Sequence, residues 1–167
     1  CLLQELPQHQ RDSVMFALAT GLRQSNVLKL EWAKVDLERQ HAWVDEIDSK
    51  NGSAIAVPLN SLAMEVLLRQ KGKHETRVFT YAGKPIANAN TKAWKKALLR
   101  AGITDFRWHD LRHTWATWQR KAGTPTHELQ SLGGWKTGAM VERYAHLDAD
   151  HLKKAANRID SVFTGYD

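Results

Sequence analysis

The sequence predicts a mainly α-helical domain of α+β type, with a small three-stranded antiparallel sheet at one edge. Two observations indicate this fold class. Several segments carry apolar residues at helical spacing and end at a glycine, which readily takes the left-handed conformation that closes a helix. Two strand-like runs flank Asn51-Gly52, a pair favoured in hairpin turns because both turn positions need a positive φ. The predicted order is therefore helices, one small sheet, then helices.

The first half of the chain is expected to hold all three strands. An apolar-periodic helix over 11–20 ends at Gly21, which reads as its stop. Ser25 is a favourable N-cap for a short helix that continues to Trp32. A further helix is expected at 61–71, and strands at 41–47, 54–59 and 77–80.

The second half is expected to be helical up to a polar tail. Gly102 and Gly123 mark the ends of two helices, and Pro125 suits the first position of the next one. Helices are expected at 91–101, 108–122 and about 138–144, followed by a polar, amphipathic tail at 148–158.

Composition indicates one globular domain with a polyanionic partner. The chain has 167 residues, and its net charge of +6 favours a polyanion, although a merely soluble basic domain would share that charge. Cys1 is the sole cysteine, so no internal disulfide can form and a reducing, intracellular compartment is expected. The sequence has no apolar run long enough for a membrane span and no signal peptide. Because it opens on cysteine, we expect a piece of a longer protein.

His109 and Arg112 are the first candidates for chemistry. They are three residues apart on a predicted helix and share a face. A guanidinium can hold two phosphate oxygens, and an imidazole can move a proton near pH 7. The alternative is a solvated surface pair. His113, four residues after His109, would suit a metal pair, but the sequence lacks the H-E-x-x-H pattern and an evident third ligand.

Arg23 and Lys50 are cations at the ends of predicted elements. Arg23 lies in a turn just before a helix start, where the helix dipole disfavours a cation, and this hints at an anionic partner. Lys50 directly precedes the Asn51-Gly52 turn and could reach into a site as a proton donor. An ordinary loop arginine and a solvated lysine are the alternatives.

Trp135 and Tyr144 complete the set of candidates. Trp135 follows Gly133-Gly134, which lets the backbone approach a neighbour closely, and its indole N–H can donate to a phosphate oxygen. Tyr144 offers a phenol that could attack a phosphodiester once a base or nearby cations remove its proton. The alternative for Tyr144 is a packing residue with a satisfied hydroxyl.

Taken together, these stretches resemble the catalytic domain of the tyrosine recombinase family, specifically phage and prophage integrases. Each stretch alone is weak, but their order along the chain is specific to the family. The resemblance spans residues 1 to about 150. The matching stretches are Ala19-Thr20-Gly21-Leu22-Arg23, Leu30-Glu31-Trp32, Val35-Asp36, Ser49-Lys50-Asn51-Gly52, Val57-Pro58-Leu59, His109-Asp110-Leu111-Arg112-His113-Thr114, Gly134-Trp135-Lys136 and Arg143-Tyr144-Ala145-His146-Leu147.

The resemblance implies site-specific DNA recombination, in phage integration and excision, through a covalent intermediate. Tyr144 would be the nucleophile that forms a 3′-phosphotyrosyl bond and releases a 5′-hydroxyl. Arg23 and Arg112 would clamp the non-bridging oxygens. Because the phosphotyrosyl bond stores the energy of the broken phosphodiester, the reaction is expected to need neither a metal nor a cofactor such as ATP.

Three further roles follow from the same resemblance. Lys50 would be the general acid for the leaving 5′-oxygen, His109 the acid/base partner, and Trp135 a donor to the phosphate. The sequence departs from the family at two positions. Asn26 stands where an acidic residue is common, and Gly133 stands where a leucine often precedes Gly-His or Gly-Trp, which is expected to loosen the backbone.

The resemblance also implies the surroundings of this catalytic domain. Residues 1–147 would form the domain, and 148–167 a C-terminal tail exchanged between protomers, while the N-terminal arm-binding and core-binding domains are absent from the chain. Double-stranded DNA attachment sites are the expected partner. The full-length protein would form a homotetramer on DNA with DNA-bending accessory proteins, and the fragment would be a monomer. The expected location is the cytoplasm of a bacterial host, at the nucleoid and away from membranes.

Three other functions fit parts of the sequence. A type IB topoisomerase uses the same chemistry on a related fold and would relax DNA without a specific site. A non-catalytic DNA-binding relic is the second, although every catalytic position holds a competent residue. A metal nuclease built on His109 and His113 is the third, and EDTA would abolish its activity.

Overall fold

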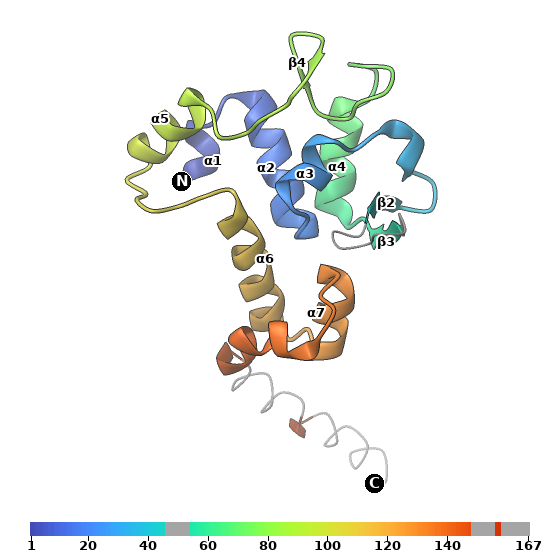
Figure 1. Cartoon of the computed structure of the whole chain (residues 1–167), viewed down its shortest axis with the longest axis vertical. Helices are drawn as coiled ribbons and strands as arrows, with labels where there is room; N and C mark the ends of the chain where they lie inside the picture. Colours follow the sequence, from blue (N-terminus) through green and yellow to red (C-terminus); the bar gives the residue numbers. More distant parts are fainter. Residues whose placement is uncertain (46–53, 148–155, 158–167) are drawn as a thin grey trace, which may run out of the picture. The chain divides into compact units, whose positions relative to one another are not determined.

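A computed structural model describes residues 1–45, 54–147 and 156–157 (Figure 1). The chain divides into two compact units, Cys1–Trp115 and Ala116–Asp167, and the boundary falls inside one helix, α6. Lys50, the Asn51-Gly52 turn and nearly all of the tail at 148–158 lie outside the described residues. In the parts that the structure describes, no helix is both long and apolar enough to cross a membrane.

The first unit is built mainly of helices, as the sequence predicts. Its α2 packs against α1, α3 and α4, and Figure 1 shows α2, α3 and α4 side by side. Phe16 of α2 and Phe79 bury their rings against each other with centroids 5.3 Å apart. The helical elements of this unit are α1 (Leu2–Glu5), α2 (Gln8–Thr20), α3 (Gln24–Leu28), the 3-10 turn η1 (Trp32–Lys34), α4 (Ser61–Gln70), α5 (Lys92–Arg100) and the start of α6 (His109–Ala122).

The three-stranded antiparallel sheet is confirmed, but one of its strands is not the predicted one. The sheet has the order β1-β2-β3, from strands β1 (Val35–Asp36), β2 (His41–Asp45) and β3 (Ala54–Pro58). The strand expected at 77–80 is wrong. Arg77 makes one isolated bridge with Glu31, and β4 (Thr80–Tyr81) pairs instead with β5 (Lys84–Pro85) as a separate two-stranded ribbon.

A local turn explains why β1 takes the third place in the sheet. The Asp36 carboxylate accepts a hydrogen bond from the Arg39 backbone N–H at 2.8 Å, which closes the chain after β1. Gln40 adopts a positive φ of 56°, and its carbonyl accepts from the Leu59 backbone N–H at 2.8 Å. The turn therefore leads the chain directly into β2. With β1 paired on one side of β2 and β3 on the other, β2 has no edge left for the segment at 77–80.

Two predicted helix starts need correction. The short helix α3 begins at Gln24 with Arg23 as its N-cap residue, so Ser25 is not the cap. Gly21 ends α2 in the left-handed region, as predicted, and Gly21, Leu22 and Arg23 alone separate the two helices. Pro125 is the N-cap residue of α7 and not its first helical residue.

The second unit contains the rest of α6 and a compact run of short helices. Its α7 (Thr126–Gly133) is followed by 3-10 segments η2 (Gly138–Met140) and η3 (Glu142–Leu147). The single α-helix expected over 138–144 is thus two 3-10 turns. The Val141 N–H donates to Gly138 O at 2.8 Å and the Tyr144 N–H to Val141 O at 3.0 Å, the tight i→i+3 pattern of such turns.

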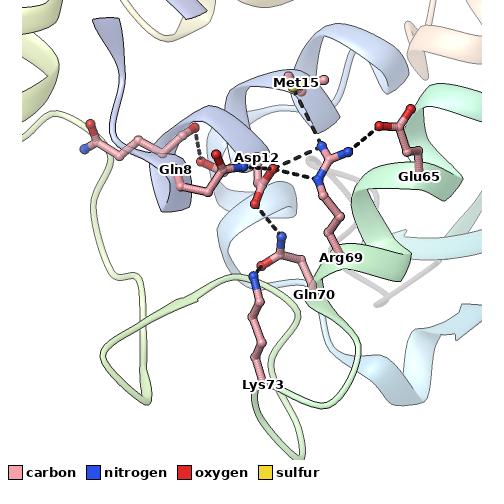
Figure 2. Close-up of polar contacts among 9 residues, drawn as sticks. Gln8, Asp12, Met15, Glu65, Arg69, Gln70 and Lys73 are labelled. Carbon is pink, nitrogen blue, oxygen red and sulfur yellow. Dashed lines mark hydrogen bonds and ion pairs between the residues drawn. The ribbon is translucent and has the colours of Figure 1, made fainter. Parts of the chain in front are cut away.

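A buried carboxylate joins α2 to α4 in the first unit (Figure 2). Asp12 is 1% exposed, and its Oδ1 accepts from Arg69 Nε at 3.2 Å, Arg69 Nη2 at 3.1 Å and Gln8 Nε2 at 2.9 Å. Its Oδ2 accepts from Gln70 Nε2 at 2.7 Å. Arg69 also pairs with Glu65 one turn away. Because buried charge is costly unless it is paired, this network fixes how the two helices pack.

Candidate active site

Arg23 is presented by a tight connection between two helices. Gly21 ends α2 with φ 70°, and its N–H donates to Ala17 O at 2.8 Å. Arg23 follows in extended conformation as the N-cap residue of α3, with its side chain half-buried. A glycine with left-handed backbone is what allows the chain to reverse within so few residues.

Arg112 is tied directly to this connection. It lies on the first turns of α6, is only 5% exposed, and its Nη1 donates to Gly21 O at 2.8 Å. The bond spans 91 residues of sequence and holds α6 against the segment that carries Arg23. A guanidinium fixed in this way needs little rearrangement to receive an anion, which is the condition for electrostatic stabilisation of a transition state.

Trp115 lies against the same glycine. A Cβ placed on Gly21 would come within 2.3 Å of the Trp115 atoms Cδ2 and Cε3, and Trp115 itself is 3% exposed. Gly21 is therefore required twice, by its positive φ and by the indole packed on its Cα. Sequence reasoning recognised Gly21 only as a helix stop and missed Trp115, because nothing local shows that residue 115 returns to residue 21.

His109 begins α6 and is exposed to solvent at the edge of this group. Its ring meets that of His113 edge-on, with centroids 4.9 Å apart and planes at 85°. Loss of water around the ring lowers the pKa of His109 below its ordinary value of 6.5, and the positive charges of His113, Arg112 and Arg23 lower it further. The bond from Arg112 to Gly21 O places Arg112 beside the segment that carries Arg23, and His109 lies three residues before Arg112 on α6.

The Asp110 carboxylate acts on His109 in the opposite direction. Its charge raises the pKa of His109, but it is the smallest of the contributions. Its Oδ2 accepts the Arg107 backbone N–H at 2.7 Å, which satisfies a donor just before the start of α6. The net effect is a His109 that is largely neutral at pH 7 and able to accept or pass on a proton.

The pair of His109 and His113 does not extend to a metal site within the described residues. Across 1–45, 54–147 and 156–157, no group of three or more His, Cys, Asp or Glu side chains is arranged to hold a metal ion. The four-residue spacing of these histidines instead produces the edge-on ring contact, and the charge of His113 adds to the desolvation that lowers the pKa of His109.

Trp135 and Tyr144 lie together in the second unit. Gly134 ends α7 with φ 64°, and the Trp135 N–H donates to Gln130 O at 3.0 Å, which turns the chain back on the helix. The Trp135 and Tyr144 ring centroids are 6.2 Å apart, with planes at 47°, and Tyr144 is 5% exposed. A Cβ on Gly133 would lie 2.1 Å from Trp135 Cζ3, so the indole covers that glycine.

The six predicted site residues are thus distributed over both units. Arg23, His109 and Arg112 belong to the first, and Trp135 and Tyr144 to the second. Lys50 belongs to the segment between β2 and β3 that lies outside the described residues.

Known proteins identify the family of the chain. The Phage integrase family matches residues 2–151, and the chain belongs to that family. It is 46% identical over 176 residues to the integrase of Salmonella phage P22, a match that covers 97% of this chain and 45% of that protein. It is 33% identical over 137 residues to a shufflon-specific DNA recombinase of Escherichia coli, covering 81% of this chain and 34% of that protein. The chain therefore spans less than half the length of these two relatives.

Solved structures share the fold. The catalytic domain of bacteriophage HP1 integrase matches with a TM-score of 0.71 and 26% identity, covering 93% of this chain and 88% of that one. The XerH site-specific recombinase, solved on a palindromic difH substrate, matches with a TM-score of 0.68 and 21% identity, covering 93% of this chain and 50% of that one. The mainly helical fold with a small antiparallel sheet is that of tyrosine recombinase catalytic domains.

Proposed function

We propose that the chain is the catalytic part of a tyrosine recombinase that cuts and rejoins DNA at specific attachment sites. The observation that carries the proposal is the buried Arg112 guanidinium, bonded to the Gly21 carbonyl beside Arg23 and His109. Two arginines and one neutral imidazole form a group suited to a phosphodiester, whose non-bridging oxygens gain charge in the transition state.

In the proposed reaction the Tyr144 oxygen attacks the scissile phosphorus. A bond forms between the phenolic oxygen and phosphorus while the bond from phosphorus to the 5′-oxygen breaks. The phenol gives its proton to the neutral imidazole of His109, and the leaving 5′-oxygen gains one from Lys50. The 5′-hydroxyl of another strand then attacks the 3′-phosphotyrosyl bond and releases Tyr144. Each phosphodiester broken is replaced by one phosphotyrosyl bond, so no ATP is consumed.

The remaining site residues support this step. Arg23 and Arg112 would hold the two non-bridging oxygens, because the fork of N–H donors on a guanidinium matches phosphate oxygens. His109, whose lowered pKa further favours the neutral imidazole at pH 7, would assist proton transfer. Trp135, whose ring faces that of Tyr144, would donate its indole N–H to the phosphate.

Double-stranded DNA is the proposed partner. The net charge of +6 favours it, and XerH and the Tn1549 integrase were solved in complex with DNA. We further propose that the longer protein acts as a homotetramer with DNA-bending accessory proteins in a bacterial cytoplasm. Residues 148–167 would be exchanged between its protomers. The two named relatives are an integrase and a DNA recombinase, which supports recombination over topoisomerase-like relaxation.

The test is trapping of the covalent intermediate. Wild type and Tyr144→Phe are incubated with a nicked attachment-site duplex in EDTA, and an SDS-resistant protein–DNA band is sought. We expect the band in wild type and its complete loss in Tyr144→Phe. Tyr81→Phe is the matched control, because Tyr81 is 61% exposed on β4 and has no proposed role. A band that survives Tyr144→Phe, or that requires a divalent metal, would overturn the proposal.

A further inference from the structure

The indole of Trp135 occupies space that exists only because residue 133 has no side chain. A Cβ on Gly133 would lie 2.1 Å from Cζ3, 2.2 Å from Cε3 and 2.9 Å from Cη2 of Trp135. These distances are far below the ~3.5–4.0 Å of an ordinary contact between carbon atoms. The six-membered ring of the indole therefore rests directly on the buried Cα of Gly133.

Backbone hydrogen bonds hold residue 135 against the end of α7. Gly134 takes φ 64°, its N–H donates to Ser131 O at 3.2 Å, and the Trp135 N–H donates to Gln130 O at 3.0 Å. Residue 135 is thus bonded back to the last turn of α7, and its side chain folds over the helix end. In this position the ring lies 6.2 Å from that of Tyr144.

We propose that Gly133 is a positioning residue of the strand-cleavage reaction, acting through Trp135. It admits the indole to the end of α7, and so sets the place of the indole N–H relative to the nucleophile Tyr144. The inference rests on the roles proposed above for Trp135 and Tyr144. It reverses the expectation that Gly133, in place of the family's leucine, loosens this segment, because the glycine is the surface on which the indole is seated.

The decisive variant is Gly133→Ala. The φ of Gly133 lies outside the left-handed region, so the backbone accepts alanine, which is the better helix former. The added methyl must push the ring away by roughly 1 Å or more, and a displacement of about that size near reacting groups can cost ~100-fold in rate. We expect covalent complex to form about 10- to 100-fold more slowly, with DNA affinity unchanged.

Gly138→Ala is the matched control. It lies in the same unit, also outside the left-handed region, and its Cβ would meet nothing nearer than Gln130 Oε1 at 3.6 Å, an ordinary contact. We expect its cleavage rate and Tm to match those of wild type. If Gly138→Ala slows cleavage as much as Gly133→Ala does, the effect belongs to any methyl in this segment and the inference fails.

A double-mutant cycle separates positioning from a general structural effect. Trp135→Ala removes the three atoms nearest to the methyl of Gly133→Ala, so the double variant should cleave no more slowly than Trp135→Ala alone. Trp135→His, which carries a smaller ring, should recover part of the rate lost in Gly133→Ala. Additive losses in the cycle, and no recovery with histidine, would overturn the inference.

A spectroscopic readout keeps this inference distinct from the proposed function. The indole N–H resonance of Trp135, assigned by its loss in Trp135→Ala, should shift in Gly133→Ala and stay in place in Gly138→Ala. If the resonance does not move in Gly133→Ala, the positioning role is wrong, whether or not the cleavage rate changes. A shifted resonance in a chain whose wild type forms no covalent complex would instead count against the proposed recombinase chemistry.

Discussion

The pKa of His109 depends on a few neighbouring residues and on its partial burial. Partial desolvation and then the charges of His113, Arg112 and Arg23 lower its pKa, while Asp110 raises it. The folded pKa lies below the unfolded value of 6.5, so the unfolded chain binds more protons as the pH falls below that value. The contribution of His109 to stability is therefore present above pH 6.5 and is lost as the pH falls through its folded pKa.

Two substitutions should move the pKa of His109 in opposite directions. His113→Gln removes a positive charge and should raise it toward 6.5, whereas Asp110→Asn removes the opposing negative charge and should lower it further. NMR titration of ring-labelled histidine measures both shifts directly. Asparagine keeps an oxygen that can accept the Arg107 N–H, so the second variant tests charge and not the loss of that bond. Shifts of the same sign would contradict this electrostatic account.

Gly21→Ala should destabilise the chain more than the backbone conformation alone explains. An alanine in the left-handed region costs about 1–2 kcal/mol, and a methyl forced against Trp115 adds roughly 1–3 kcal/mol. Gly102→Ala is the matched control, because Gly102 has a similar φ of 66° and nothing within 4 Å of its Cβ position. Denaturant unfolding should show the larger loss of free energy for Gly21→Ala. Equal losses would mean that the indole moves aside freely.

At this same scale, sequence reasoning selects polar and charged residues in short, ordered motifs and misses residues that only make room for others. Arg23, His109 and Arg112 were selected in this way; Arg112 Nη1 bonds to Gly21 O, two residues before Arg23, and the roles of the three residues in the reaction stay predictions. Trp115 was not predictable, since its partner is Gly21, 94 positions earlier in the sequence. Packing over a glycine has no local signature in the sequence.

At the level of elements, the Asp12 network determines how α2 and α4 pack. Asp12→Asn keeps the shape of the side chain but removes the negative charge of the carboxylate that accepts from Arg69 and Gln70. One of the two acceptor oxygens is also replaced by an NH2 group, which cannot accept from its donor. Because Arg69 is partly exposed, we expect a loss of about 2–3 kcal/mol, less than for a fully buried ion pair, and a Tm lower by roughly 5–10 °C.

Glu65→Gln provides the control for this prediction. It removes the other ion-pair partner of Arg69, at an exposed i,i+4 position on α4. Exposed pairs of this kind contribute only about 0.3–0.5 kcal/mol. Thermal unfolding followed by circular dichroism compares the two variants. Similar Tm values for both would show that burial of Asp12 adds nothing to the link between the helices.

The predicted elements succeed and fail for identifiable reasons. Helices that end at a glycine were placed well, because the left-handed residue at 21 closes α2 with its own hydrogen bond. The strand at 77–80 was misplaced because strand propensity does not tell which strand a segment pairs with. The turn at Asp36 instead brings β1, which is nearer in sequence, alongside β2. The helix at 138–144 became 3-10 turns, a distinction too fine for apolar spacing to resolve.

At the scale of the whole molecule, fold class was the most predictable property. A mainly helical fold with a small antiparallel sheet follows from periodicity and turn residues, and the family follows from the order of short motifs. The division into Cys1–Trp115 and Ala116–Asp167 did not follow, because the boundary lies within the continuous helix α6 and leaves no break in the apolar pattern. The proposed nucleophile and the proposed phosphate clamp thus belong to different compact units.

The seating of Trp135 on Gly133 has a consequence for how such sequences can change over generations. If Gly133 acts as proposed, a mutation that gives residue 133 a side chain should slow cleavage while the indole is present, and a smaller ring at 135 should relieve that loss. The order of substitutions is therefore constrained, with the aromatic residue changing first and the glycine second. In this chain glycine should be kept at 133 for as long as residue 135 is tryptophan, and family members that carry leucine before Gly-Trp must seat their indole elsewhere.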